Sequence, residues 1–186
     1  MEEVYKKIVD TFRAHPEVFT QRGLPAIRQI DINIGQPDDP ENFEVLCPAL
    51  FIGWDIRAGS GSESDTLSLD FHLLQEPGAG TENFSERLNE GLEYIRLAAA
   101  VKYCLNMLST DISSPLKYSG ERQATTPFFR YHVLTYTCSI DGTTESVHRP
   151  TLTESTVESI RLTGGRLREA FPNKIPIPDI ETFKQK

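Results

Sequence analysis

Residues 66–75 read TLSLDFHLLQ, and this alternation of apolar and polar residues is the clearest β-strand pattern in the chain. Large apolar residues occupy alternate positions on one side, while Ser68, Asp70 and His72 occupy the other. Since successive side chains of a strand point to opposite faces, we expect one face of this strand in a core and the other in contact with water.

Four further segments are expected to complete a sheet with it. Residues 27–34 alternate with period two and predict a strand with one solvent-facing side, whereas residues 48–56 are apolar on both sides and predict a strand in the middle of the sheet. Residues 128–140 are rich in aromatic and β-branched residues, and residues 116–124 are expected to be extended with a weaker pattern. The Gly/Ser-rich residues 57–65 predict a hairpin loop.

Two segments have helical periodicity. Residues 2–13 predict a short amphipathic helix that ends before Pro16, because proline cannot continue the helical hydrogen bonds. In residues 85–108 apolar side chains recur at steps of three or four, which predicts one helix of about 22 residues, roughly 33 Å long, enough to lie across a sheet. Gly91 either weakens this helix or allows it to approach the sheet closely.

Together these patterns predict an α+β fold. We expect a small, mostly antiparallel sheet with one long amphipathic helix packed on one face, and a short N-terminal helix. Residues 1–143 would form this core domain. Residues 144–186 contain few aromatic residues and four prolines, and we expect them to form an extended C-terminal arm rather than a second domain.

The charge balance and the cysteines restrict the classes of function. The chain of 186 residues has 27 acidic and 19 basic residues, a net charge of −8, which disfavours broad nucleic-acid binding. The cysteines, Cys47, Cys104 and Cys138, are too widely spaced for a disulfide framework or a metal knuckle. No apolar run predicts a membrane span, and the charged N-terminus lacks the apolar core of a signal peptide, so we expect a protein made and kept in the cytoplasm.

Few residues suggest catalysis. Asp70 and His72 lie two apart on the polar side of one strand, where they could form half of a metal or acid–base site, but no third ligand is near them in the sequence. A solvated strand face is the simpler interpretation. The glycine-containing stretches at 59–61 and 78–80 lack the spacing of phosphate-binding loops, so we predict no cofactor, no metal and no catalytic residue.

The loops are better candidates for function, because loop tips held on a rigid sheet commonly contact partners. The residues expected to make such contacts are Arg57, Ser60, Glu63, Asp65, Glu76 and Glu82. A loop surface suits protein binding more than chemistry, so the sequence favours assembly or binding over catalysis.

The expected elements follow one another as a short N-terminal helix, strands, a long helix and a long return strand at 131–140. A Pro-Ala-Leu-Phe-Ile sequence at 48–52 leads into the second strand, and the strand at 67–73 follows it. Over residues 1–142 this order resembles that of phage tail-terminator and tail-completion proteins, also called minor tail or neck proteins.

The resemblance implies a structural protein without enzymatic activity. Such a protein forms a homo-oligomeric ring, usually a hexamer, that caps the tail tube and joins it to the head-connector proteins. DNA would pass through the ring without specific binding, which suits a net negative protein. The resemblance also implies a place in the bacterial cytoplasm during assembly and then in the virion tail or neck.

Two other classes stay open. A small-ligand-binding or hydrolytic enzyme of ferredoxin-like build would place a pocket between helix and sheet, and it requires Asp70, His72 and His132 to converge within about 4 Å of one point. A protein-interaction adaptor domain would bind a single protein partner. The identity of the flanking genes separates a virion component from an adaptor.

Overall fold

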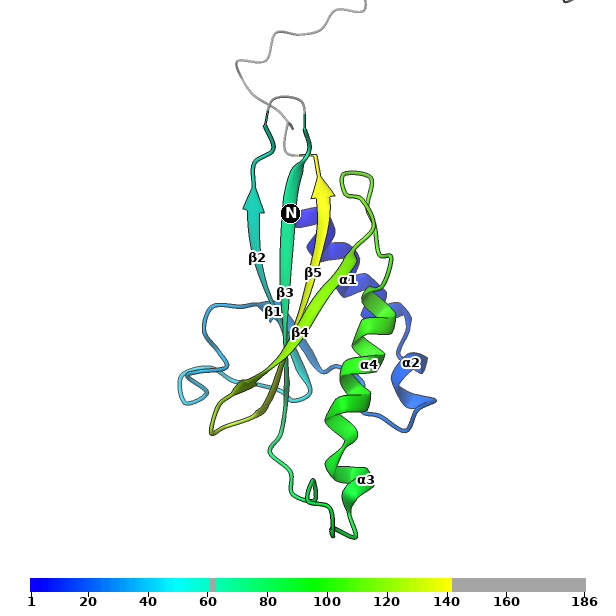
Figure 1. The fold of residues 1–186 in the computed structure, drawn as a ribbon, viewed down its shortest axis with the longest axis vertical. Helices are drawn as coiled ribbons and strands as arrows, with labels where there is room; N and C mark the ends of the chain where they lie inside the picture. The colour runs from blue at the N-terminus through cyan, green and yellow to red at the C-terminus, as the bar shows by residue number, and fades with distance from the viewer. Residues whose placement is uncertain (61–62, 142–186) are drawn as a thin grey trace, which may run out of the picture. The chain divides into compact units, whose positions relative to one another are not determined.

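One mixed sheet of five strands organises the computed structural model, which describes residues 1–60 and 63–141 (Figure 1). The strands are β1 (Gln29–Ile32), β2 (Ala49–Arg57), β3 (Asp65–Gln75), β4 (Lys117–Thr125) and β5 (Arg130–Ile140). They lie in the order β1-β2-β3-β5-β4; β1 and β2 are parallel, and the other three pairings are antiparallel. The α+β class is confirmed, with a mixed sheet. The expected C-terminal arm, 144–186, lies outside the described residues.

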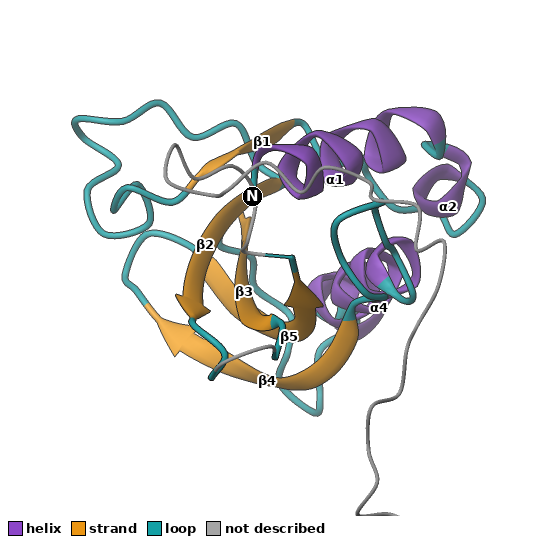
Figure 2. Cartoon of the chain, turned by 90° about the horizontal axis from the view of Figure 1, so that it is seen from above, coloured by secondary structure: helices purple, strands orange, loops and turns teal. Residues whose placement is uncertain are grey.

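In the described part of the chain, four helices accompany the sheet: α1 (Glu2–Ala14), α2 (Glu17–Thr20), α3 (Leu88–Gly91) and α4 (Glu93–Leu105). The prediction of a short N-terminal helix that ends before Pro16 is confirmed by α1. Pro16 itself is the N-cap of α2. Figure 2, which views the chain from above, shows α1 and α4 on the same side of the curved sheet.

The main core fills the space between these two helices and the sheet. It joins Ile8 of α1, Leu97 of α4 and Leu69 of β3, all of which are completely buried. The ring of Phe71 packs edge-on against the ring of Tyr136 on β5, with centroids 5.6 Å apart. Burying one such large side chain stabilises a fold by roughly 1.5–3 kcal/mol, so the apolar side of β3 holds the helices to the sheet, as its pattern predicted.

The prediction of one long helix over residues 85–108 is confirmed only in part, because the helical residues form two helices, α3 and α4, that are interrupted at Leu92 (φ −92°, ψ 4°). A Cβ atom at Gly91 would lie 2.3 Å from the carbonyl oxygen of Gly80, so only glycine allows the loop after β3 to cross here. The Gly91 carbonyl accepts a hydrogen bond from Arg130 of β5 at 2.5 Å. Gly91 does allow a close approach, but to a loop rather than to the sheet.

A second, smaller cluster covers part of the opposite face of the sheet. Phe51, Leu74 and Cys47 are buried in it, and Tyr131 packs against them. The segment between β1 and β2 is fixed nearby by Gln36, whose buried side chain donates to the Ile32 carbonyl at 2.7 Å and accepts from the Ile34 amide at 2.8 Å. Among the described residues, both faces of the sheet are therefore covered where the first half of β2 lies beside Leu74 and Tyr131.

Candidate functional site

A histidine on the less covered face of the sheet is held by two polar side chains. His72 of β3 lies 2.5 Å from the Tyr131 hydroxyl through Nδ1 and 3.1 Å from Asn33 Nδ2 through Nε2. The Asn33 amide nitrogen can only donate, and its Oδ1 already accepts from the Gly35 amide, so Nε2 accepts and Nδ1 carries the proton. Burial lowers the pKa of His72, which favours the neutral imidazole.

Asp70 shares this face with His72, as their spacing on the strand predicted. Its Oδ1 accepts a hydrogen bond of 2.6 Å from Thr135 of β5 rather than one from His72. The negative charge of Asp70 raises the pKa of His72 less than burial lowers it. Asp70 and His72 therefore belong to two neighbouring hydrogen-bonded groups, not to one acid–base pair.

His132 lies on the other face of the sheet. It is paired with Leu73 across β3 and β5, whereas His72 is paired with Val133, so the two histidines point to opposite sides. The Nε2 atom of His132 is 3.7 Å from Glu121 Oε2, and neither ring nitrogen has a hydrogen-bond partner among the described residues. The convergence of Asp70, His72 and His132 that the enzyme hypothesis requires does not occur.

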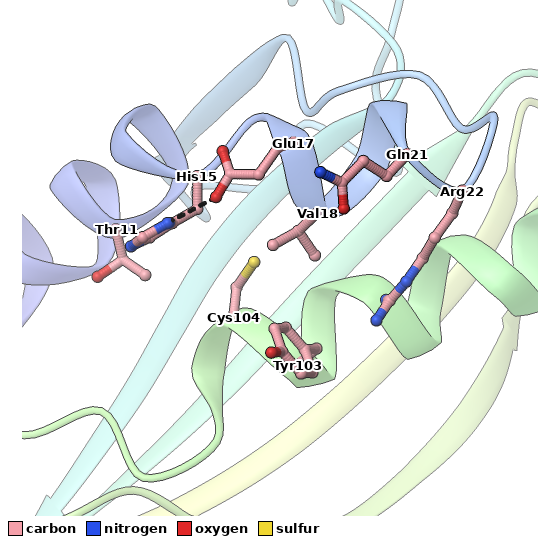
Figure 3. Close-up of a pocket in the computed structure, with 8 residues that line it drawn as sticks. All are labelled: Thr11, His15, Glu17, Val18, Gln21, Arg22, Tyr103 and Cys104. Carbon is pink, nitrogen blue, oxygen red and sulfur yellow. Dashed lines mark hydrogen bonds and ion pairs between the residues drawn. The ribbon is translucent and has the colours of Figure 1, made fainter.

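A pocket that the sequence did not predict lies between α1, α2 and α4 (Figure 3). Its volume is about 460 Å³. His15 Nδ1 and Glu17 Oε1 lie 2.9 Å apart at its rim, and Figure 3 shows Cys104 on α4 facing Val18 on α2. Burial raises the pKa of the Cys104 thiol to about 11, so this cysteine stays protonated at neutral pH and is a poor nucleophile.

A larger groove of about 660 Å³ runs between α4 and the β4 edge of the sheet. We call it the tyrosine groove; it is lined by Arg22, Arg96, Ala99, Lys102, Tyr103, Asn106, Tyr118 and Tyr136. The Arg22 guanidinium lies 5.0 Å from the centre of the Tyr103 ring, and the Lys102 ammonium lies 5.4 Å from the centre of the Tyr118 ring. The groove thus combines positive charge with aromatic surface.

Part of this groove could be predicted from the sequence, because of the spacing of its α4 residues. Arg96, Ala99, Tyr103 and Asn106 recur at steps of three or four, so they share the side of α4 that faces away from the core. The contributions of Arg22 and Tyr118 come from other elements. Only the tertiary structure brings them to the groove.

Apolar side chains are exposed where β1 and β2 extend beyond the core. We call this set the apolar stripe: Ile32, Ile34, Trp54 and Ile56, with exposed fractions of 40%, 65%, 43% and 43%. Ile32 is paired with Ile52 of β2, and Trp54 follows two residues later on the same side of that strand. Figure 1 shows the β2–β3 hairpin reaching past the helices at this end. A contiguous apolar surface rather than a loop tip is therefore the clearest candidate contact.

The predicted contact residues of the β2–β3 hairpin form hydrogen bonds and ion pairs within the hairpin itself. Arg57 pairs with Asp55 at 3.2 Å, Ser60 donates to Glu63 at 3.0 Å, and Asp65 accepts from the Gly59 amide at 2.9 Å. These contacts shape the hairpin tip.

The other two predicted contact residues lie elsewhere. Glu76 and Glu82 are exposed and follow the opposite end of β3, roughly 35 Å away for a strand of this length. The six residues thus belong to two separate loops, and a partner that contacts one loop does not need the other.

No family model matches the sequence, and no curated protein matches it. Within residues 1–60 and 63–141, no helix has the length and apolar character that a membrane span requires. The same residues contain no cluster of three His, Cys, Asp or Glu side chains suited to a metal ion.

Proposed function

We propose that the chain is a structural protein of a phage or prophage head–tail junction, which caps the tail tube as a homo-oligomeric ring and joins it to the head connector. The observation that carries the proposal is the apolar stripe. Solvent-exposed tryptophan and isoleucine side chains on adjacent strands are typical of protein–protein contacts, because their burial on binding provides the driving force. The order of the elements resembles that of tail-terminator proteins, and from this resemblance we infer that the partner is the tail tube.

The fold suits such a role. The stripe lies on strands whose other ends are fixed in the core, so a partner meets a preorganised surface at a small entropic cost. In addition, β1 is a short strand at the edge of the sheet, with one side unpaired within the described residues. A strand edge next to exposed apolar side chains can also pair with a strand of a partner.

Electron microscopy of tail tubes tests this proposal. Tubes purified from the phage or prophage that encodes the chain would be mixed with the protein and imaged in negative stain. We expect rings at the tube ends with the unmodified chain, and none with the double variant Trp54→Ser, Ile56→Ser. Phe84→Ser is the matched control, because Phe84 is 92% exposed in a loop far along the chain from the stripe. Bare tube ends with the unmodified chain would refute the proposal.

A small-ligand-binding or hydrolytic enzyme is the second candidate, and the His72 group favours it. A neutral imidazole is the protonation state that a general base requires, and His72 could take a proton at Nε2 only after the hydrogen bond from Asn33 is released. The test compares the unmodified chain with His72→Ala against a panel of activated esters and phosphoesters. Turnover that this substitution abolishes would favour an enzyme, whereas equal background rates would remove this candidate.

An adaptor domain that binds one protein partner is the third possibility, since the apolar stripe suits any protein ligand. Genes for capsid, portal or tail-tube proteins beside the gene for this chain would support a virion component. Their absence would support the adaptor.

A further inference from the structure

Positive charge is concentrated in the tyrosine groove. Residues 1–143 contain 12 basic and 21 acidic residues, a net charge of −9, and three of these 12 basic side chains line the groove. Lys102 forms an ion pair of 2.8 Å with Glu121. Arg22 and Arg96 form no ion pair with a described carboxylate, and Arg96 instead donates to the Asn89 carbonyl at 2.6 Å. The groove therefore presents two arginines that no described carboxylate neutralises, in a strongly acidic protein, which favours an acidic ligand.

The loop after β1 has the opposite character. Four carboxylates fall within residues 38–44, and we call this segment the acidic loop: Asp38, Asp39, Glu41 and Glu44. None of them forms an ion pair with a described lysine or arginine; Asp39 accepts only from Asn42, at 2.9 Å. Asp38, Glu41 and Glu44 are exposed. Their charge is thus available to a partner.

The groove and the acidic loop lie at opposite edges of the sheet. Tyr118 of the groove is on β4, and the acidic loop follows β1; these strands are the two outermost of the five. Figures 1 and 2 both place the loop after β1 and helix α4 on opposite sides of the sheet. The two surfaces cannot meet within one copy, but they can meet between copies. A contact between two different surfaces of identical chains is head to tail and closes into a ring when the rotation permits.

We propose that the acidic loop of one copy binds the tyrosine groove of the next. Carboxylates of the loop would pair with Arg22 and Arg96, and the hydroxyl of the exposed Tyr103 would donate a hydrogen bond to them. Aromatic rings and arginine are the residues enriched at the centres of protein interfaces. The proposal rests on the proposed function only for the closure into a ring; the contact itself requires only a second copy.

A nucleic acid is the other acidic ligand that such a groove could attract. The net charge of −9 over residues 1–143 opposes it, because a polyanion must approach the whole domain, whereas a loop engages the groove locally. Binding of a fluorescent single-stranded oligonucleotide that requires Arg22 and Arg96, with no self-association, would overturn the proposal.

Charge reversal in the groove and in the loop tests the contact. The groove variant is Arg22→Glu, Arg96→Glu, and the loop variant is Asp38→Lys, Asp39→Lys, Glu41→Lys; all these positions are outside the core. Sedimentation velocity over a range of concentrations measures self-association. We expect each variant alone to associate more than about tenfold more weakly than the unmodified chain, since like charges then face each other. The matched control Lys117→Glu, a cation of β4 outside the groove, retains the association.

Mixing the two variants gives the decisive result. In an equimolar mixture, the intact loop of the groove variant meets the intact groove of the loop variant, and the reversed surfaces are again complementary. We therefore expect mixing to restore association, as should a single chain that carries all five substitutions. Association that neither variant weakens, or that mixing does not restore, would overturn the proposal.

The failure of this contact and the failure of the proposed function are separable. An unmodified chain that is monomeric at every concentration would overturn the head-to-tail contact, while rings at the ends of tail tubes would still support the junction role. Conversely, charge-dependent association without any binding to tail tubes would support the contact and refute the junction role.

Discussion

One face of β2 is apolar along its whole length, but the two halves of the strand have different surroundings. Residues 49–52 are completely buried, with helices on one side and the smaller cluster on the other, whereas Trp54 and Ile56 are each 43% exposed. On the face that carries Leu50 and Ile52, the apolar pattern continues through Trp54 and Ile56, so on this face the difference in exposure arises from what packs on the strand. Apolar residues that no other described residue covers indicate a surface suited to another molecule.

The largest effect is expected from a cavity in the buried half. Phe51→Ala removes a completely buried ring from the smaller cluster, and such substitutions reduce the free energy of unfolding by about 3–5 kcal/mol. Urea unfolding followed by circular dichroism measures the change. A loss below about 1 kcal/mol would show that the smaller cluster is not a true core, and the contrast between the two halves would disappear.

The next effect concerns the pH dependence of the buried half, because His72 is the cross-strand neighbour of Phe51. The pKa of His72 is lowered in the folded state, mainly by burial. At a pH below the usual pKa of 6.5 the unfolded state therefore binds more protons, and the free energy of unfolding falls as the pH falls through this range.

Substitution of His72 isolates its share of this pH dependence. Between pH 7.5 and pH 5.5, two values that bracket the ordinary histidine pKa, we expect the free energy of unfolding to fall less in His72→Gln than in the unmodified chain. Urea unfolding midpoints at the two pH values provide the measurement. An equal or larger loss in the variant would mean that His72 is not held as a neutral imidazole.

The smallest effect on stability is expected in the exposed half. Trp54→Ala removes a side chain that is already half in contact with water, so the free energy of unfolding should fall by less than about 1 kcal/mol. The same urea experiment measures it, beside Phe51→Ala. A loss as large as that of Phe51→Ala would mean that Trp54 contributes to the core and is not reserved for a partner.

The sequence predicts the elements of this fold better than their surroundings. The alternation in residues 66–75 and the apolar run at 128–140 identify β3 and β5, because strand patterns are local. The break at Leu92 is not visible in the pattern, since it depends on contacts of Gly91 with Gly80 and Arg130, which are distant in the sequence. Leu108 matches the helical spacing, yet it is buried in the turn after α4.

The candidate sites illustrate the same limit. Because side chains alternate along a strand, the sequence of β5 already places His132 on the same face as Leu134, the apolar face. The sequence could therefore have shown that His132 and His72 lie on opposite faces. The partners of His72 could not, because Asn33 and Tyr131 reach it only through strand pairing. The exposure of Trp54 could not be predicted either, since the sequence does not show how far along the sheet the helices extend.

The emission of Trp54 tests most directly whether the apolar stripe is a contact surface. It is the only tryptophan in the chain, so intrinsic fluorescence reports this site alone. On addition of tail tubes from the encoding phage or prophage, we expect the emission maximum to shift to shorter wavelength and to become resistant to quenching by iodide, because binding removes the indole from water. Emission and quenching that stay unchanged when the protein cosediments with the tubes would contradict a role for the stripe in assembly.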